Sequence, residues 1–217
     1  MKLYHLIMHL LFPPKCVLCG RTLEKNETDL CRNCRLDAPE YPDSKRRIQF
    51  LDSFTAVWYY EDNVRRSLLR FKFHGARSYA SVYGRQLAMK LDREHPEGFD
   101  VLTWVPVSRL RRFRRGYDQV ELIARSAGRE LGLTPVPVLQ KIRHNPPQSG
   151  IQDASIRRAN VLGAYRLKDP SQVRGKRILL LDDILTTGAT AGECARMLQM
   201  AGAKEVHCAA VAAARKG

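Results

Sequence analysis

Two adjacent carboxylates and a hydroxyl-rich turn follow one apolar stretch of the sequence. Asp182 and Asp183 come directly after the apolar run 178–181, and the turn 186–190 (TTGAT) leads into a helical pattern over 192–202. The glycine of this turn lets the backbone approach a ligand, and the N-terminus of the helix favours a phosphate. Because carboxylates repel an anion, we expect Asp182 and Asp183 to face sugar hydroxyls or a magnesium ion of the same ligand.

The two common phosphate-binding motifs are absent from the sequence. It contains neither G-x-x-x-x-G-K-[ST] nor a G-x-G-x-x-G that follows a strand, so nucleotide hydrolysis and dinucleotide binding are not favoured. An ordinary strand, turn and helix with a Thr-rich connection is the alternative interpretation. It is the weaker one, since two carboxylates directly after a buried strand are costly unless something pairs with them.

Four cysteines near the N-terminus have the spacing of a metal site. Cys16-x-x-Cys19 and Cys31-x-x-Cys34 form two knuckles separated by eleven residues, and four thiolates at this spacing predict a tetrahedral structural zinc site. Disulfides are the weaker alternative, because no secretory signal is recognised and a reducing compartment is expected. A segment of about forty residues with little apolar content needs such a metal as its core.

Five arginines crowd the exit from another predicted strand. They occupy five of the seven positions from 109 to 115, directly after the run 99–106. Because ligands of doubly wound sheets bind outside the carboxyl ends of the strands, this loop and the Asp182-Asp183 loop are expected on the same rim. A diphosphate fits between them, although a solvated basic turn is the blander alternative. The irregular stretch 142–150 is a candidate lid over the same site.

Composition and charge limit the remaining possibilities. The chain has 217 residues, 44% of them apolar, which suits one α/β domain with a small appendage. We place the boundary between residues 1–49, an N-terminal helix and zinc module, and residues 50–217. The net charge of +15 indicates a polyanionic partner, either nucleic acid or a phosphate-rich substrate. With no recognised membrane span or signal peptide, a cytoplasmic location is expected.

The hydrophobic pattern predicts alternating strands and helices, and hence a parallel sheet flanked by helices. An amphipathic helix is expected over 3–11. Cys194 and Cys208 are interpreted as ordinary core residues. Strands are predicted at 54–60, 99–106, 136–141, 161–167, 178–181 and 205–211, and helices at 63–73, 79–91, 118–131 and 192–202.

Together these motifs resemble the ComF (GntX-type) family of phosphoribosyltransferase-like proteins associated with competence and DNA uptake. The four cysteines match that family's N-terminal zinc finger, 114–119 (RRGYDQ) its R-x-R-G-[FY]-[ND]-Q signature, and 182–190 its phosphoribosyl-diphosphate (PRPP) loop. The stretch 143–148, with Arg158 and Asn160, resembles the family's hood. Asp118 stands where the family more often has asparagine.

The resemblance implies a type I phosphoribosyltransferase fold that binds PRPP with Mg²⁺. Enzymes of this fold break the bond between C1 and the diphosphate through an oxocarbenium-like transition state. Asp182 and Asp183 are then expected to hold the ribose hydroxyls, and Ser108 and Arg109 to line the diphosphate, with Arg112 and Arg115 nearby. The residues expected to hold the 5-phosphate are Thr186, Thr187, Gly188, Ala189 and Thr190.

Two functional hypotheses of different class therefore stand. The first is an enzyme that transfers phosphoribosyl to an unidentified acceptor; the second is a non-enzymatic or PRPP-sensing factor that binds single-stranded DNA in the competence machinery. In the second hypothesis, the arginine cluster and the zinc segment both contribute to DNA binding. Arg111 and Arg114 are expected to be more important for DNA than for PRPP if their side chains point away from the diphosphate. The resemblance also suggests a competence helicase as partner.

Overall fold

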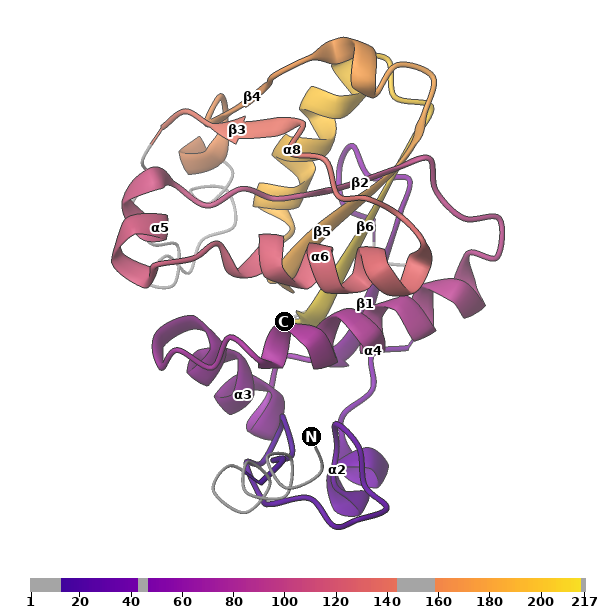
Figure 1. Ribbon diagram of the computed structural model, residues 1–217. Helices are drawn as coiled ribbons and strands as arrows, with labels where there is room; N and C mark the ends of the chain where they lie inside the picture. The colour runs from indigo at the N-terminus through magenta and orange to yellow at the C-terminus, as the bar shows by residue number, and fades with distance from the viewer. Residues whose placement is uncertain (1–12, 43–46, 144–158, 216–217) are drawn as a thin grey trace, which may run out of the picture.

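The chain folds around a four-stranded parallel β-sheet (Figure 1). The computed structural model describes residues 13–42, 47–143 and 159–215. All neighbouring strands of this sheet run parallel, as crossover connections through helices require. The α/β class expected from the sequence is therefore confirmed. In spatial order the strands are β1 (Ser53–Tyr59), β6 (Glu205–Ala213), β5 (Arg177–Leu185) and β2 (Val101–Trp104).

Strand β5 lies inside the sheet and is buried on both faces. Leu179 and Leu181 pack into one hydrophobic cluster, while Ile178 and Leu180 pack into another. This alternation follows from the pleat of a strand, and it explains why the sequence here is a continuous apolar run. The predicted buried strand is confirmed.

The strand is longer than the sequence pattern predicted. Asp182 and Asp183 lie within β5, which continues to Leu185, so the carboxylates do not follow its end as we expected. Asp182 pairs with Ala210 of β6 in the parallel ladder. The partner strand is rich in alanine here, and such small side chains leave room beside polar groups. The two carboxylates are thus fixed by sheet hydrogen bonding rather than by a loop.

Helices cover both faces of the sheet (Figure 1). Helices α4 (Tyr79–Glu94) and α6 (Gln119–Leu131) lie on the face of Leu179 and Leu181, and α8 (Ala189–Met200) lies on the other. A Cβ atom at Gly84 of α4 would lie 2.4 Å from Cβ of Ser126 in α6, so glycine permits the close approach of these helices. Cys194 and Cys208 are fully buried core residues, as predicted. Helix α3 spans Asp62–Phe73, and a short 3-10 helix, η2, spans Pro170–Gln172.

The arginine cluster forms a helix and not the loop we expected. Helix α5 spans Arg109–Arg115, and the side chain of Ser108 accepts a hydrogen bond from the backbone N–H of Arg111 at 3.4 Å. The helix ends at Gly116, whose φ of 73° is the left-handed conformation that glycine adopts without strain. None of its residues is buried. Its position is therefore set by its two ends.

Two short strands form a separate antiparallel ribbon, β3 (Leu139–Lys141) with β4 (Tyr165–Leu167). Both are shorter than the predicted strands, and neither joins the main sheet. The ribbon packs beside α8, and Val138 and Tyr165 belong to the core on that face. Most of the predicted hood and lid, including residues 144–158, lies outside the described residues.

The N-terminal segment packs against α3 and α4 and shares their hydrophobic core (Figure 1). It contains helix α2 (Arg32–Asp37). Val17 and Leu18 are each about 1% exposed. Their carbonyls accept hydrogen bonds from Arg70 of α3 at 3.2 and 2.6 Å, and Ser67 also donates to that of Val17. The domain boundary at residues 49 and 50 stays a prediction, and the expected helix 3–11 lies outside the described residues. No helix in the described parts of the chain is long and apolar enough to cross a membrane.

Candidate functional site

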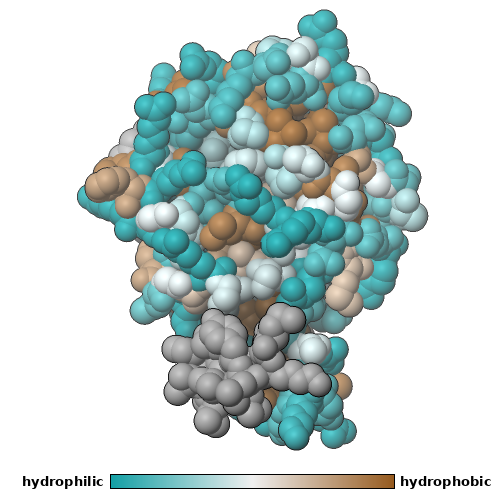
Figure 2. Space-filling model, viewed as in Figure 1, coloured by the Kyte–Doolittle hydropathy of each residue, from teal (hydrophilic) through white to brown (hydrophobic). Residues whose placement is uncertain are grey.

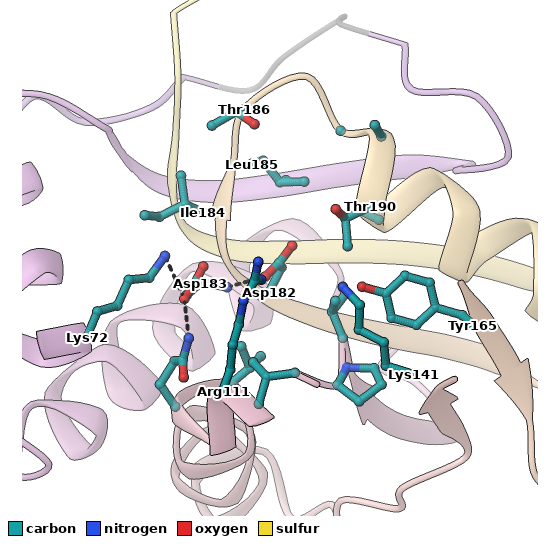
Figure 3. A pocket seen from close by; sticks show the side chains of 18 of the residues that line it. Lys72, Arg111, Lys141, Tyr165, Asp182, Asp183, Ile184, Leu185, Thr186 and Thr190 are labelled. Carbon is teal, nitrogen blue, oxygen red and sulfur yellow. Dashed lines mark hydrogen bonds and ion pairs between the residues drawn. The ribbon is translucent and has the colours of Figure 1, made fainter. Parts of the chain in front are cut away.

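A polar pocket of about 180 Å³ lies beside the end of β5 (Figure 3). Its walls come from β5, from the turn that leads into α8, from the ends of α3 and α6, from α5, and from the β3–β4 ribbon. Segments distant in sequence thus meet at one place. The polar and loop residues that line the pocket are Lys72, Arg111, Arg115, Gln119, Lys141, Tyr165, Asp182, Asp183, Thr186, Gly188, Ala189 and Thr190.

Asp183 is held by two partners from different helices. The Nζ atom of Lys72 lies 2.9 Å from its Oδ2, and Nε2 of Gln119 donates to the same oxygen at 3.2 Å (Figure 3). Sequence reasoning missed Lys72. No local motif marks it, since its role depends on where α3 ends in space. The pair fixes Asp183 on one side of the pocket.

Asp182 lies in a different environment from its neighbour. It is 8% exposed and accepts the backbone N–H of Asp183 at 2.8 Å. Burial, together with the negative charge of Asp183, raises the pKa of Asp182 to about 8. A buried carboxyl group with this pKa binds its proton at neutral pH. A ligand that offers hydroxyl donors or a cation would therefore stabilise the ionised form.

The turn before α8 presents backbone to the pocket. Gly188 has φ of 81° and is the N-cap residue of α8, so no side chain caps this helix from that position. The first N–H groups of the helix lack partners within the helix and form, with Thr190, a site that suits a phosphate. A Cβ atom at Gly188 would lie 2.7 Å from the side chain of Ile48. Glycine is therefore required here for conformation and for space.

Four cations surround the pocket. Besides Lys72, they are Arg111 and Arg115 from α5 and Lys141 from β3. Burial lowers the pKa of Arg115, and the negative charge of Asp183 offsets part of this decrease. Burial also lowers the pKa of Lys141. The Lys141 ammonium lies 5.1 Å from the ring centroid of Tyr165. Cations held this close together favour a ligand with several negative charges.

The predicted diphosphate residues do not all reach this pocket. Arg115 lines it, but Ser108 is buried as the N-cap of α5 and Arg109 is exposed away from the lining. Arg112 lies 3.5 Å from Glu121 in a salt bridge. The helical form of α5 explains this, because residues four apart share one face. Arg111 therefore lines the pocket with Arg115, so the condition under which Arg111 was expected to serve DNA more than PRPP, a side chain that points away from the site, is not met.

The turn 186–190 divides between two hollows. Thr186, Gly188, Ala189 and Thr190 line the polar pocket, whereas Thr187 lies in the lining of a neighbouring hollow that contains Ile48. The Thr187 hydroxyl accepts the backbone N–H of Ala189 at 3.3 Å. Thr187 therefore shapes the turn. Phosphate binding by the five residues stays a prediction.

The RRGYDQ segment joins the helices that build the site. The hydroxyl of Tyr117 donates to the carbonyl of Phe71 in α3. Asp118 caps α6, because Oδ1 accepts the N–H groups of Val120 and Glu121 at 3.0 and 3.2 Å, and Oδ2 accepts that of Val107 at 3.3 Å. Three donors suit a carboxylate better than the amide of asparagine, which has one acceptor oxygen. The next residue, Gln119, then reaches Asp183.

The four N-terminal cysteines converge on one point. Their Sγ atoms all lie within 4.8 Å of one another, and those of Cys19 and Cys31 are 3.7 Å apart. Tetrahedral zinc with bonds of about 2.3 Å places its sulfur ligands about 3.8 Å apart. Among the described residues, this is the one group of three or more potential metal ligands. The cluster is consistent with structural zinc, and its cysteines form no disulfide.

The fold is an α/β domain whose parallel sheet is like that of type I phosphoribosyltransferases, and the polar pocket lies beside its strand β5. Residues 119–217 match the phosphoribosyl transferase domain family, and residues 7–45 match the double zinc ribbon domain family. Competence protein F of Haemophilus influenzae is 26% identical over 200 residues, which cover 89% of this chain and 82% of the relative. Competence protein ComFC of Bacillus subtilis is 28% identical over 183 residues, which cover 84% of this chain and 70% of the relative. DNA utilization protein YhgH of Escherichia coli is 27% identical over 208 residues, which cover 88% of this chain and 87% of the relative.

The chain thus joins a region that matches the phosphoribosyl transferase domain family to an N-terminal region that matches the double zinc ribbon family, and over most of its length it is similar to proteins named for competence and for DNA utilization. Two solved structures resemble it in part. Glutamine PRPP amidotransferase from B. subtilis is 22% identical with a TM-score of 0.44, over 65% of this chain and 30% of that chain. A hypoxanthine-guanine-xanthine phosphoribosyltransferase is 16% identical with a TM-score of 0.34, over 61% of this chain and 62% of that chain. The chain thus spans less than two thirds of either protein.

Proposed function

We propose that the polar pocket binds PRPP with Mg²⁺ and that the domain transfers the phosphoribosyl group to an acceptor. The observation that carries this proposal is the arrangement of opposite charges within one pocket. A helix N-terminus lies at one side, two carboxylates lie in the middle, and four cations surround them. PRPP has the matching order of groups, with a phosphate, a ribose bearing hydroxyls, and a diphosphate.

In this proposal the turn before α8 holds the 5-phosphate, and Asp182 and Asp183 accept hydrogen bonds from the ribose hydroxyls. Arg111, Arg115 and Lys141 face the diphosphate. Among the described residues, Asp182 and Asp183 do not belong to a group of three or more potential metal ligands. A pair of carboxylates suits Mg²⁺, which keeps several waters and binds through substrate phosphates, and its bound charge would offset that of the diphosphate. The pKa of Asp182, about 8 without ligand, is expected to fall when ribose and cation are present.

The reaction needs no nucleophile from the protein. The C1–oxygen bond breaks and the diphosphate leaves with the bonding electrons, while a nucleophile of the acceptor bonds to C1 from the opposite face of the ribose. The cations of the pocket stabilise the charge that gathers on the departing diphosphate, and positioning of the two reactants contributes the rest. A screen of candidate acceptors for PRPP-dependent release of diphosphate tests this activity and identifies the acceptor.

Two arginines of α5 provide a matched test of the pocket. We expect Arg115→Ala to weaken Mg-PRPP binding tenfold or more, because it removes a charged hydrogen-bond donor worth about 1.5–3 kcal/mol. Arg112→Ala removes the same charge from a residue outside the lining and is expected to change affinity less than threefold. Titration calorimetry measures both. Equal losses in the two variants would contradict the assignment of the diphosphate to the inner face of α5.

A second function, binding of single-stranded DNA in DNA uptake, has independent support. Proteins named for competence and for DNA utilization are relatives of this chain. The net charge is +15, and Arg109, Phe113 and Arg114 are exposed on α5. Such a mixture of cations and an aromatic ring suits a sequence-tolerant binder of single strands. A contribution of the zinc segment and a helicase partner stay predictions, as does a cytoplasmic location.

A salt titration with a labelled oligonucleotide tests the DNA hypothesis. Each phosphate contact on a single strand contributes about 0.7 to the log–log slope of affinity against salt, so Arg109→Gln with Arg114→Gln is expected to reduce the slope by roughly 1.4. Arg125→Gln with Arg129→Gln, on α6, removes equal charge away from α5. A slope unchanged in the α5 variant, or no binding at low salt, would exclude α5 from DNA binding.

A further inference from the structure

A second hollow of about 700 Å³ adjoins the polar pocket. It lies beside the C-terminal end of α3 and the inner face of α5, and Lys72, Arg111 and Arg115 line both spaces. We call this hollow the α3–α5 groove. In Figure 1, α3 and α5 lie on the same side of the molecule, and Figure 2 shows that side as mainly hydrophilic with separate hydrophobic patches. The proposed binding of PRPP does not use the aromatic residues or Arg77 of this groove.

Three aromatic rings line the α3–α5 groove. Phe73 is 63% exposed, which is unusual for a large apolar side chain, and Tyr60 lies near it. The ring of Tyr117 is fixed, because its hydroxyl donates to the carbonyl of Phe71. Tyr117 is only 8% exposed and has the Arg77 guanidinium over its ring. The exposed ring of Phe73, with the half-buried ring of Tyr60, therefore provides the flat surface on which a nucleobase stacks.

The same groove is strongly basic. Arg77 and Arg114 add two guanidinium groups to the three shared cations, and no carboxylate among the described residues lines it. The guanidinium of Arg77 lies 4.7 Å from the ring centroid of Tyr117, and that of Arg115 lies 5.1 Å from that of Phe73. Stacking on these rings holds the guanidinium groups in place and leaves their edges able to donate to a phosphate.

We propose that the α3–α5 groove is a second ligand site that binds a nucleotide unit, with the phosphate on the arginines and the base on the rings. A phosphate alone would contact the arginines and not the aromatic rings, and an uncharged aromatic ligand would contact the rings and leave the arginines without an anionic partner. The nucleotide unit comes either from a free nucleotide or from a nucleic-acid strand. If the unit belongs to a strand, the inference rests on the proposed binding of single-stranded DNA and names its site; if the unit is a free nucleotide, the inference goes beyond the proposed function, because the groove has its own rings and needs no PRPP to bind.

Binding of four probes tests the chemistry: thymidine monophosphate, thymidine, ribose 5-phosphate and an oligothymidine of about eight nucleotides, each titrated into the full chain. We expect the two nucleotide probes to bind at least tenfold more tightly than thymidine or ribose 5-phosphate, which each lack one half of the unit. If the oligonucleotide binds a hundredfold more tightly than the mononucleotide, a strand is the source; similar affinities indicate a free nucleotide. Equal binding of ribose 5-phosphate and the mononucleotide would overturn the proposal.

Two exposed apolar side chains locate the site. Phe73→Ala removes a ring of the groove and is expected to weaken nucleotide binding about tenfold, whereas Met89→Ala removes a side chain that is 62% exposed on α4 and lies outside the groove. Both side chains are exposed, so both variants are expected to fold, which thermal melting checks. Equal losses in the two variants, or no loss in either, would overturn the location. The thermal shift with Mg-PRPP, measured on the same samples, is expected to persist in Phe73→Ala, and its absence from wild type would instead count against the proposed function alone.

Discussion

Asp182→Asn is expected to abolish the stabilisation of the protein by Mg-PRPP and to make the ligand-free protein more stable above neutral pH. The first effect follows from the loss of a carboxylate that, in our proposal, accepts ribose hydroxyls. A ligand at a hundredfold excess over its dissociation constant stabilises the native state by about 2.7 kcal/mol, so the loss is readily measured by thermal melting.

The second effect follows from the pKa of Asp182. Its pKa is about 8 in the folded chain and 3.8 as an ordinary aspartate. Between these values the folded state keeps the proton while the unfolded state loses it, so this group makes the free energy of unfolding fall as pH rises through the window. Asparagine cannot ionise and avoids the loss. We expect the variant to be more stable than wild type by several kcal/mol at about pH 9, and similar to it near pH 4.

Asp169→Asn is the matched control, since Asp169 is a half-buried cap of η2 outside the pocket. The hydrogen bonds from Ser171 lower the pKa of Asp169, so its contribution to stability has the opposite sign and is lost as pH falls. Thermal unfolding from acid to alkaline pH, with and without Mg-PRPP, compares the variants. An Asp182→Asn protein that is less stable than wild type at alkaline pH, or that still responds to Mg-PRPP, would contradict this account of the site.

Removal of the zinc ligands is expected to destabilise the whole chain and not only its N-terminal segment. Cys16→Ser with Cys31→Ser leaves two thiols, too few to hold zinc, and the binding free energy of a structural zinc is on the order of 10 kcal/mol. Val17 and Leu18 belong to the same hydrophobic core as α3 and α4. When the knuckle unfolds, Arg70 loses its two carbonyl partners.

Metal analysis and thermal melting test this expectation. We predict one zinc per chain in wild type, none in the double variant, and a lower melting temperature for the variant. Because Lys72 lies two residues after Arg70 in α3, we also expect weaker binding of Mg-PRPP. Cys194→Ser is the control, since it removes a buried thiol outside the cluster and is expected to keep the zinc. Full zinc content in the double variant would rule out the site.

The parts of the fold set by local pattern were predictable from the sequence. The apolar run of β5 and the glycine turn before α8 each depend on neighbouring residues, and so do the paired cysteines. The meeting of the four cations that line the pocket does not depend on neighbouring residues, and the sequence did not predict it. Lys72 and Lys141 come from a helix end and a separate ribbon, and only the folded chain brings them to Asp183 and Arg111. The spacing of these residues in the sequence does not predict that their side chains lie close together.

Helix α5 is different, because the sequence did contain its signals. Ser108 is a favoured N-cap residue and Gly116 is a favoured residue at a helix end. We interpreted the intervening arginines by their charge and expected a loop. Had the helix been recognised, the spacing of four between Arg111 and Arg115 would have placed both on one face. Asp118 likewise has the position and type of an N-cap, which explains its place before α6.

Titration calorimetry of the zinc-loaded wild-type protein with PRPP, in the presence and absence of Mg²⁺, tests the central claim most directly. The account predicts saturable binding of one PRPP per chain, strengthened by Mg²⁺, weakened in Arg115→Ala and lost in Asp182→Asn. Ribose 5-phosphate, which lacks the diphosphate, is expected to bind much more weakly, because it leaves the cations without a partner. Absence of binding at millimolar Mg-PRPP by a folded protein that holds its zinc would contradict the claim.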